Sequence, residues 1–563
     1  MSRRDGAFGL VLVLVLGGLG AAIAAPAFEP VAVPTPTPAP TAALVVVHRQ
    51  AVVGRPSSVN PVTARTQADR DLVALLFRGL VRAGKDGRPV GDLAAGWTSE
   101  AKGTRWTFRI RADARWQDGA PVTSDDVVYT VRVLQDPAYA GPLAAGWQGV
   151  TVTAIDAAIV RFDLAVPLGG FLQAAAQPLL PAHLLASVPV AELADSPFST
   201  RPVGNGPFVL TDLTTEAALL EPIIEPLHPG SGPLATLGPG VVASGRPRLA
   251  GLELRFYPGP DEAAAAYRAG EVDAVSGLPP AAAAALAAER ATRLIAYPGT
   301  TLTGVYLNLR PGAGPFSDAR VRTALLAAID RGGMITDLLA GSGQQANTPI
   351  PPSSWAYDPK AAPPVAYDRT AAAAGLRAAG WKRAGVGWLP PKAKKPVTIV
   401  LLAADATVNP VTAGAAARVA AAWRSLGIPT TVTSLAAGDL VERLRGAEFV
   451  AAVADVNVGL DPDPYPLLAS AQVQAGGSNV SGFQDSALDA ALAAARAPGK
   501  DAVRAAAYAK LQALLGRLQP ILPLFFRDNV LVVSNRLVGP RAVPVADPSG
   551  RFWDVITWLP FGR

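Results

Sequence analysis

The chain has 563 residues, half of them hydrophobic, and a formal net charge of +6. Its 54 glycines and 53 prolines follow no period, which excludes a collagen-like protein and is typical of a large globular protein rich in loops. The sequence contains no cysteine, which excludes disulfides, thiolate catalysis and cysteine-ligated metal centres.

The N-terminal segment predicts export. Arg3 and Arg4 precede an uncharged run over residues 6–28, which has a Leu/Val-rich centre and small residues near its end. This is the layout of a secretory signal peptide, and the run is also long enough to act as a membrane anchor if it is not cleaved. Residues 29–43 are rich in Pro and Thr and predict a stiff, extended linker. We therefore expect an exported protein, periplasmic or at the cell surface, which is anchored wherever residues 1–28 are retained.

Beyond residue 43, strand-like runs alternate with Ala-rich segments of helical period. Residues 43–47 begin the folded body, and further strands are predicted at 106–111, 159–164, 208–210, 252–257, 305–309, 397–402 and 530–533. Helices are predicted at 69–80, 125–134, 261–269, 318–329, 368–379, 412–425, 486–495 and 501–518. The predicted fold class is α/β with mixed sheets.

Several of these helices carry start or stop signals. Thr123 and Asp126 form a predicted capping box ahead of a Val-rich helical face. Ser317 is the expected cap of its helix, with Asp318 as a negative residue in the first turn. Pro520 is expected to stop the long C-terminal helix. These signals support the predicted helices and leave the topology open.

Three features that could carry chemistry have simpler interpretations. Residues 341–346 match a variant of the dinucleotide fingerprint, but a helical segment stands where that motif needs a strand, so we interpret them as a loop after a helix. His48, His183 and His228 are far apart in sequence and predict no metal site, and no cofactor is expected. The basic cluster within residues 382–395 is interpreted as the solvated rim of a hairpin. No dense Lys/Arg stripe is present, so nucleic acid is not an expected partner.

A series of short motifs in a fixed order covers nearly everything from about residue 45 onward. The first block includes Asp92-Leu93-Ala94-Ala95-Gly96-Trp97 and, farther on, Trp116-Gln117-Asp118-Gly119. This block resembles the signature of the family 5 extracellular solute-binding proteins, the peptide/nickel-type binding proteins of ABC importers. Further matches follow in the family's order at residues 202–208, 269–273, 307–309, 316–322, 328–331, 379–381, 461–464, 488–489 and 519–524.

The resemblance implies a two-lobed periplasmic-binding-protein-like (type II) fold with an extra domain, which encloses its ligand by a hinge motion. Lobe I is then expected over residues 44–65, 195–295 and 530–563, the extra domain over 66–194, and lobe II over 296–529. The resemblance also implies a monomer that captures oligopeptides or similar small molecules and delivers them to the permease subunits of an ABC transporter. No enzymatic activity is implied.

The resemblance further implies a set of ligand-binding residues. Peptide-binding members pair the α-amino group of the ligand with an Asp three residues before an Asp-Pro pair, and this chain has Leu460 at that position. Asp461 could take over if the loop shifts by one residue, whereas Asp461 and Asp463 are equally well explained as turn residues. Trp355 either lines the cavity or anchors its own loop. The other candidates are Arg65, Thr66, Tyr306, Asn308, Asn457 and Tyr465.

Three alternatives to peptide transport remain open at this point. The same fold could bind a nickel complex, an oligosaccharide or an opine, and the departure at Leu460 keeps that reading open. The chain could be a sensory or structural exoprotein that has lost transport. A secreted hydrolase that uses paired carboxylates is the third, although only the presence of Asp pairs supports it.

Overall fold

The computed structural model describes residues 47–139, 141–223, 249–289, 291–474 and 477–560. Residues Val46–Arg563 form one compact unit. The predicted signal or anchor segment, the linker and His228 lie outside the described residues. Among the helices of the described ranges, none is long and apolar enough to cross a bilayer.

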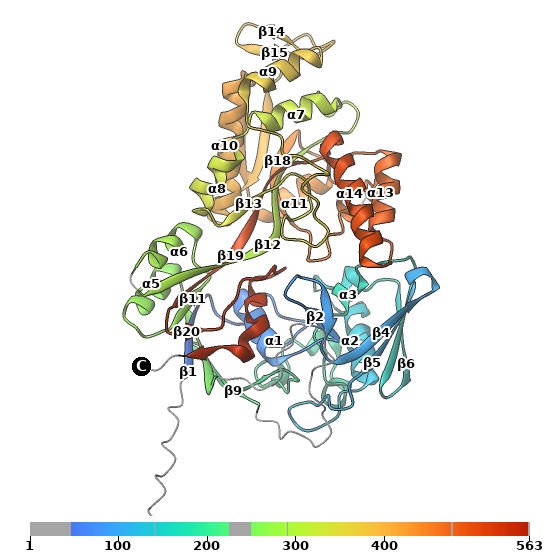
Figure 1. Cartoon of the computed structure of the whole chain (residues 1–563), viewed down its shortest axis with the longest axis vertical. Helices are drawn as coiled ribbons and strands as arrows, with labels where there is room; N and C mark the ends of the chain where they lie inside the picture. The colour runs from blue at the N-terminus through green and yellow to red at the C-terminus, as the bar shows by residue number, and fades with distance from the viewer. Residues whose placement is uncertain (1–46, 140, 224–248, 290, 475–476, 561–563) are drawn as a thin grey trace, which may run out of the picture. The chain divides into compact units, whose positions relative to one another are not determined.

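A mixed sheet of eleven strands organises this compact unit (Figure 1). Its strands follow the order β17-β16-β18-β12-β19-β11-β1-β10-β9-β8, and β13 pairs with β19 off this path. The strands are β1 (Val47–Val53), β8 (Phe208–Leu213), β9 (Ala217–Pro222), β10 (Gly251–Tyr257), β11 (Ala274–Ser276), β12 (Thr292–Leu307), β13 (Gly343–Gln345), β16 (Ile399–Ala404), β17 (Thr430–Leu435), β18 (Ala451–Asn457) and β19 (Leu522–Ser534).

Two long strands, β12 and β19, are shared by the two sides of this sheet. Residues 292–297 of β12 pair with residues 529–534 of β19, which also pairs with β11. Residues 301–307 of β12 pair with β18, and residues 301–305 also pair with residues 522–527 of β19. We call β11, β1, β10, β9 and β8 the first side, and β18, β16 and β17 the second side. The two sides are therefore joined through β12 and β19.

Smaller sheets and hairpins complete the strand content of the described chain. A four-stranded antiparallel sheet has the order β4-β5-β7-β6, and three further pairs form two-stranded sheets. The remaining strands are β2 (Val81–Ala83), β3 (Pro89–Gly91), β4 (Ala94–Glu100), β5 (Arg105–Ile110), β6 (Val150–Asp156), β7 (Ile159–Leu164), β14 (Lys382–Ala384), β15 (Gly387–Leu389), β20 (Leu537–Val538) and β21 (Leu559–Pro560).

Helices cover both faces of the second side. Ile399, Leu401 and Ala403 of β16 belong to a core with α7, α9 and α10, whereas Leu402 and Ala404 belong to another core with α11, α13 and α14. The α-helices are α1 (Gln67–Leu76), α2 (Ser124–Gln135), α3 (Phe171–Ala174), α4 (Ala182–Leu185), α5 (Pro260–Arg268), α6 (Pro280–Ala287), α7 (Ala319–Ala327), α8 (Arg331–Leu339), α9 (Arg369–Ala378), α10 (Pro410–Leu426), α11 (Ala437–Arg445), α12 (Tyr465–Leu468), α13 (Ser486–Arg496) and α14 (Asp501–Leu518).

The predicted α/β class with mixed sheets is confirmed, and the predicted helices are present with small shifts at their ends. In the capping box of α2, the Thr123 N–H donates to Asp126 Oδ2 at 2.8 Å. Asp318, and not Ser317, is the N-cap of α7, because its carboxylate accepts from the Arg320 N–H. Gln519 ends α14 in the left-handed conformation, one residue before Pro520.

Three predicted boundaries were wrong for identifiable reasons. The helix predicted to reach residue 80 ends at Leu76, whose carbonyl instead accepts the N–H groups of Asn205 and Gly206. The strand predicted at 305–309 is the end of the much longer β12, which stops at Leu307, and the strand predicted at 530–533 lies within the longer β19. Both strands contain residues that are typical of strand ends, namely Pro298-Gly299 in β12 and Arg527-Asp528-Asn529 in β19. The pairing of β12 with β19 nevertheless continues on both sides of these residues.

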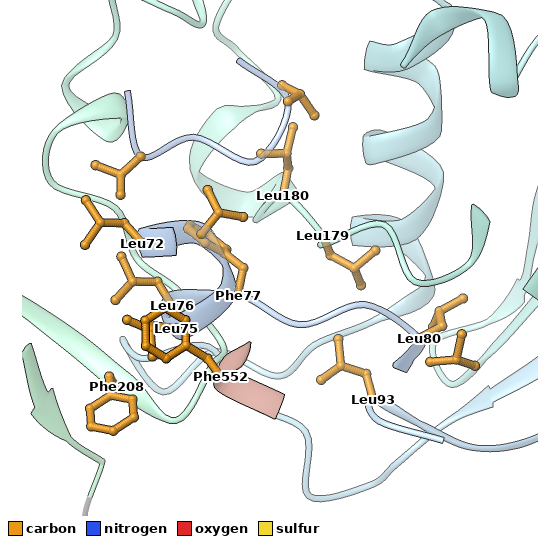
Figure 2. Packing of buried hydrophobic residues seen from close by; sticks show 14 of the residues in the cluster. Leu72, Leu75, Leu76, Phe77, Leu80, Leu93, Leu179, Leu180, Phe208 and Phe552 are labelled. Carbon is orange, nitrogen blue, oxygen red and sulfur yellow. The ribbon is translucent and has the colours of Figure 1, made fainter. Parts of the chain in front are cut away.

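The largest core cluster runs from Val52 to Trp558 and contains residues of the four-stranded sheet as well as of the first side. Figure 2 shows Leu72, Leu75 and Leu76 of α1 in the same cluster as Phe208 of β8 and Phe552 of the 3₁₀ segment η7 (Pro548–Thr557). Since one continuous core spans these parts, the boundary predicted between lobe I and an extra domain stays a prediction.

His48 gives the stability of this core a pH dependence. Its ring is buried, lies edge-on to Trp558 and has Nδ1 4.0 Å from Asp273. Burial lowers the pKa of His48 to about 4, against the opposing effects of Asp273 and Gln50. The unfolded chain therefore binds more protons below pH 6.5, and the stability that the neutral ring contributes is lost as pH falls toward 4. We expect unfolding free energy to drop by about 2 kcal/mol between pH 6.5 and pH 5 from this group alone.

Urea denaturation across this pH range measures the effect. His48→Gln should flatten the slope, because it removes the buried ring that titrates in this range. An unaltered slope in His48→Gln would show that other groups set the pH dependence.

Candidate functional site

The chain passes from one side of the main sheet to the other at two segments that lie next to each other, one in β12 and one in β19. The pairing of β12 with β19 is irregular between Tyr297 and Thr301. A Cβ atom at Gly299 would lie 2.1 Å from the carbonyl oxygen of Arg527. Glycine is therefore the residue that permits this close approach of the two backbones. A motion of one side against the other must bend these two segments.

Asn457, one of the predicted site residues, links this crossing to the C-terminal segment. It is the last residue of β18, and its Oδ1 accepts from Thr300 Oγ1 at 2.7 Å and from the Gly459 N–H at 3.0 Å. Its Nδ2 donates to the carbonyl of Ala546 at 2.7 Å. Asn457 therefore joins three segments where the two sides meet.

Asp455 lies two residues earlier on β18, and its carboxylate accepts hydrogen bonds from several side chains. It accepts from Thr303 Oγ1 at 2.7 Å, Asn409 Nδ2 at 2.7 Å and Thr412 Oγ1 at 2.9 Å. It also pairs with the guanidinium of Arg527 in β19. The charge of Asp455 is thus neutralised from within the protein.

The loop after β18 carries Asp461, which is paired in the same way. Arg504 of α14 donates from Nη1 and Nη2 to its two carboxylate oxygens, each at 2.8 Å. The side chains of Asp461 and Arg504 are 4% and 11% exposed, so this is a buried bidentate pair. Tyr508, one turn further along α14, donates to the Pro462 carbonyl at 2.6 Å. These contacts hold the loop against α14.

Asp463 and Tyr465 share a different arginine. Arg496, at the end of α13, lies 2.9 Å from Asp463 Oδ2, and its Cζ lies 4.2 Å from the centroid of the Tyr465 ring. Burial raises the pKa of Asp463, and the charge of Arg496 opposes that rise. Asp463 Oδ1 also accepts from the Tyr465 N–H at 3.1 Å. Like Asp455 and Asp461, Asp463 has an arginine of its own.

Trp355 contacts two guanidinium groups. The Cζ atom of Arg504 is 4.8 Å from the centroid of its ring, and that of Arg88 is 5.5 Å away. The ring of Tyr508 meets Trp355 edge-on at 5.4 Å. Arg88 belongs to the turn between β2 and β3 and also lies 3.5 Å from Asp501, the first residue of α14. We call Arg88, Trp355, Arg496, Arg504 and Tyr508 the arginine–tryptophan cluster.

The cluster brings the segment of residues 86–170 against the α13–α14 pair. Besides the Arg88–Asp501 contact, the Gly169 N–H donates to the carbonyl of Arg496 at 2.7 Å. Within the described ranges, the Nε atoms of Arg88, Arg496 and Arg504 and Ser353 Oγ are buried without a hydrogen-bond partner. Buried polar atoms normally have a partner in the protein, in water or in a ligand. We therefore take the cluster as the candidate binding site.

The other predicted site residues lie elsewhere. Thr66 is the N-cap of α1 and accepts from the Asp69 N–H at 3.0 Å, and Arg65 precedes it with an exposed side chain. Tyr306 is buried in the core that faces α11 and α14. Asn308 donates to the carbonyls of Ala447 and Phe449, each at 3.0 Å. The contacts of Thr66 and Asn308 shape the backbone, and the ligand role predicted for these residues stays a prediction.

The structure thus brings together Trp355, Asp461, Asp463 and Tyr465 and adds residues that the sequence reasoning missed. Arg88, Arg496 and Arg504 come from a turn and from two Ala-rich helices. No local motif sets them apart from the other arginines. In the described part of the chain, no group of three His, Asp or Glu side chains could hold a metal ion.

Comparisons with known proteins agree with this architecture. The model of the family described as "Bacterial extracellular solute-binding proteins, family 5 Middle" matches residues 88–479. The oligopeptide-binding protein AppA of Bacillus subtilis is 24% identical over 503 residues, which cover 88% of this chain and 89% of AppA.

Solved structures show the same fold. The structure of AppA in complex with a nonapeptide aligns with a TM-score of 0.66 and 22% identity over 91% of this chain and 99% of AppA. NikZ of Campylobacter jejuni in complex with Ni(L-His) aligns with a TM-score of 0.68 and 21% identity over 91% of this chain and 99% of NikZ. The fold is that of the type II periplasmic binding proteins, as the sequence predicted.

Proposed function

The chain belongs to the family 5 bacterial extracellular solute-binding proteins, and from this premise we propose that it captures oligopeptides or peptide-like solutes for an ABC importer. Family members act outside the cytoplasm, which fits the export predicted from residues 1–28. The partners we propose are a small-molecule or oligopeptide ligand and the permease subunits of the transporter. Binding alone performs this function, since no bond of the solute has to be made or broken.

The observation that carries the proposal is the pair of shared strands between the two sides of the sheet. Because β12 and β19 are the strands that continue from one side to the other, the sides can move as bodies about residues 298–300 and 527–529. A solute that contacts both bodies favours the closed arrangement by the free energy of those contacts. We propose that lobe I and lobe II meet at this crossing.

We place the solute beside the arginine–tryptophan cluster. The region combines the aromatic rings of Trp355 and Tyr465 with the Nε atoms of Arg496 and Arg504, which have no hydrogen-bond partner among the described residues and suit carbonyl or carboxylate oxygens of a solute. Aromatic walls with a few convergent polar groups are typical of small-molecule sites.

The carboxylates of this region point to how the solute is recognised. Asp455, Asp461 and Asp463 are paired with Arg527, Arg504 and Arg496 respectively. None of the three therefore offers an uncompensated charge to the α-amino group of a peptide. We propose that affinity comes from backbone and side-chain contacts and does not depend on a free amino terminus. The same observation favours, as a second candidate, a solute that has no amino group.

A thermal-shift screen of the full chain tests the proposed function. The probes are a mixed pool of tri- to pentapeptides, oligosaccharides, opines and nickel–histidine complexes. A ligand at a hundred times its Kd adds about 2.7 kcal/mol to the stability of the folded state, which raises Tm by a few degrees in a protein of this size. A shift with peptides supports the proposal, and a shift with another class alone reassigns the solute. No shift with any class would contradict a solute-binding role.

The acetylation of a peptide tests the absence of an amine anchor. For a peptide that shifts Tm, we expect the N-acetylated form to bind within about threefold of the free form, because no unpaired carboxylate among residues 455–463 would lose a partner. Isothermal titration measures both affinities. A loss of a hundredfold or more on acetylation, about 2.7 kcal/mol or more, would show that a carboxylate binds the ammonium group after all.

A further inference from the structure

The positive charge of this protein is concentrated in one short stretch. Between residues 369 and 404 the chain carries seven Lys and Arg residues and no Asp or Glu. The whole chain has a formal net charge of +6, so the remainder is close to neutral. Four of the nine lysines of the chain lie within residues 382–395, which we call the basic hairpin. They are Lys382, Lys392, Lys394 and Lys395.

The basic hairpin projects from the second side of the sheet. It contains β14, β15 and the segment that leads to β16, and Figure 1 shows β14 and β15 beyond α9. All four lysines are exposed, and Val386 at the turn is 89% exposed. Lys392 has a φ of 63°, so its backbone occupies the left-handed region. The charges are thus presented at an outer edge, together with an apolar tip.

One tryptophan anchors the hairpin to the body beneath it. Trp388 is fully buried, and its Nε1 donates to the carbonyl of Leu426 at 2.8 Å. Arg383 and Arg377 lie over its ring, with Cζ atoms 4.4 Å and 5.7 Å from the centroid. These contacts fix the base of the hairpin, so its lysines are held in a defined position on the protein.

The exposed lysines of the hairpin lack acidic neighbours. Across the described residues, no carboxylate lies within 4.0 Å of the ammonium groups of Lys382, Lys392, Lys394 or Lys395. Like charges that lie so near in the chain repel one another, and an external anion relieves that repulsion. The surface is therefore complementary to a negatively charged partner.

The chemistry of the hairpin identifies the kind of partner. Residues 382–397 contain only Lys, Arg, Ala, Gly, Val, Leu, Pro and Trp. No hydroxyl, amide or carboxylate side chain is present to recognise a particular group, and the one aromatic ring is buried, so bases cannot stack on it. Lysine is a hydrated point charge that suits a diffuse field better than bidentate recognition. We propose that the basic hairpin binds the anionic phospholipid surface of a membrane, with Val386 at its tip.

This binding goes beyond the proposed capture of a solute and does not depend on it. An anionic bilayer attracts clustered lysines within about a Debye length, roughly 8 Å at physiological salt. Contact through the outer edge of the second side would hold the protein at the membrane, where a permease lies. The hairpin is formed by residues outside the arginine–tryptophan cluster, so the two proposals can fail separately.

Vesicle flotation of the full chain tests the proposal. Wild type is compared on vesicles of phosphatidylcholine alone and on vesicles that also contain phosphatidylglycerol, at low and high NaCl. One variant combines Lys382→Gln, Lys392→Gln, Lys394→Gln and Lys395→Gln. The matched control combines Lys85→Gln, Lys102→Gln, Lys360→Gln and Lys510→Gln, four exposed lysines elsewhere that remove the same net charge. Any binding through residues 1–28 is the same in all three proteins.

Each lysine near an anionic surface contributes about fivefold to binding, so the loss of four should lower the affinity of the hairpin variant for phosphatidylglycerol vesicles by about 600-fold. The control should stay within a few fold of wild type, and high NaCl should abolish the difference. Equal loss in both variants would assign the effect to net charge and overturn the proposal. So would equal binding of wild type to the two kinds of vesicle, or hairpin-dependent binding to duplex DNA without binding to vesicles.

Discussion

Asp461→Asn is expected to lower the free energy of unfolding by about 3–5 kcal/mol, because it leaves the buried guanidinium of Arg504 without its counter-charge. Both Arg504–Asp461 hydrogen bonds are 2.8 Å long, and neither side chain has ready access to water. The loss also frees the loop that carries Asp463 and Tyr465, so the affinity for the solute should fall in parallel. Urea denaturation measures the first effect and titration calorimetry the second.

A surface pair supplies the control for this substitution. Asp163 pairs with Arg105 and Arg161 on the four-stranded sheet and is 30% exposed, so Asp163→Asn should cost no more than about 1 kcal/mol. In the double variant Asp461→Asn with Arg504→Gln, neither partner of this pair carries a charge, and part of the lost stability should return. If Asp461→Asn proves no more costly than Asp163→Asn, the pair does not hold the loop.

Asp71→Asn is the second substitution expected to cost about 3–5 kcal/mol. Asp71 of α1 is fully buried and pairs with Arg551 of η7, with a hydrogen bond of 2.7 Å from Arg551 Nη1 to Asp71 Oδ1. The pair joins residues 480 positions apart in the chain. Its loss should loosen the C-terminal segment from α1, which proteolysis at the C-terminus and urea denaturation would both detect.

The matched control for Asp71→Asn is Glu289→Gln. Glu289 pairs with Arg268, but the two side chains are 43% and 51% exposed, and we expect a change within about 1 kcal/mol. The contrary result, a cost for Asp71→Asn no larger than for Glu289→Gln, would mean that other contacts, such as the packing of Phe552 and the Asn457–Ala546 hydrogen bond, hold the C-terminal segment.

The sequence predicted the helices better than the shared strands. For α2 and α14, apolar periodicity and end signals act over neighbouring residues, so the local sequence contains most of what determines them. For β12 and β19, polar or turn-forming residues interrupt the apolar run at the crossing. Arg527 is accommodated there by Asp455, 72 positions away, and no local pattern reveals such a partner.

The candidate site, like the fold, was predicted only in part. Family resemblance drew attention to Trp355, Asp461, Asp463 and Tyr465, which the structure does bring near one another. It gave no sign that Arg504 pairs with Asp461 or that Arg496 pairs with Asp463, since these arginines lie on helices that begin after the motif. Thr66 was named as a ligand contact because of its place in the resemblance, whereas its hydroxyl caps α1.

The most direct test of a solute-binding function is titration calorimetry of the full chain with a peptide found in the thermal-shift screen, followed by mass spectrometry of the recovered peptide. We predict saturable binding of one peptide to each chain and recovery of the peptide with its mass unchanged. A peptide recovered in fragments would show that the protein is a hydrolase, and the absence of binding heat at every temperature tried would contradict the capture of peptides.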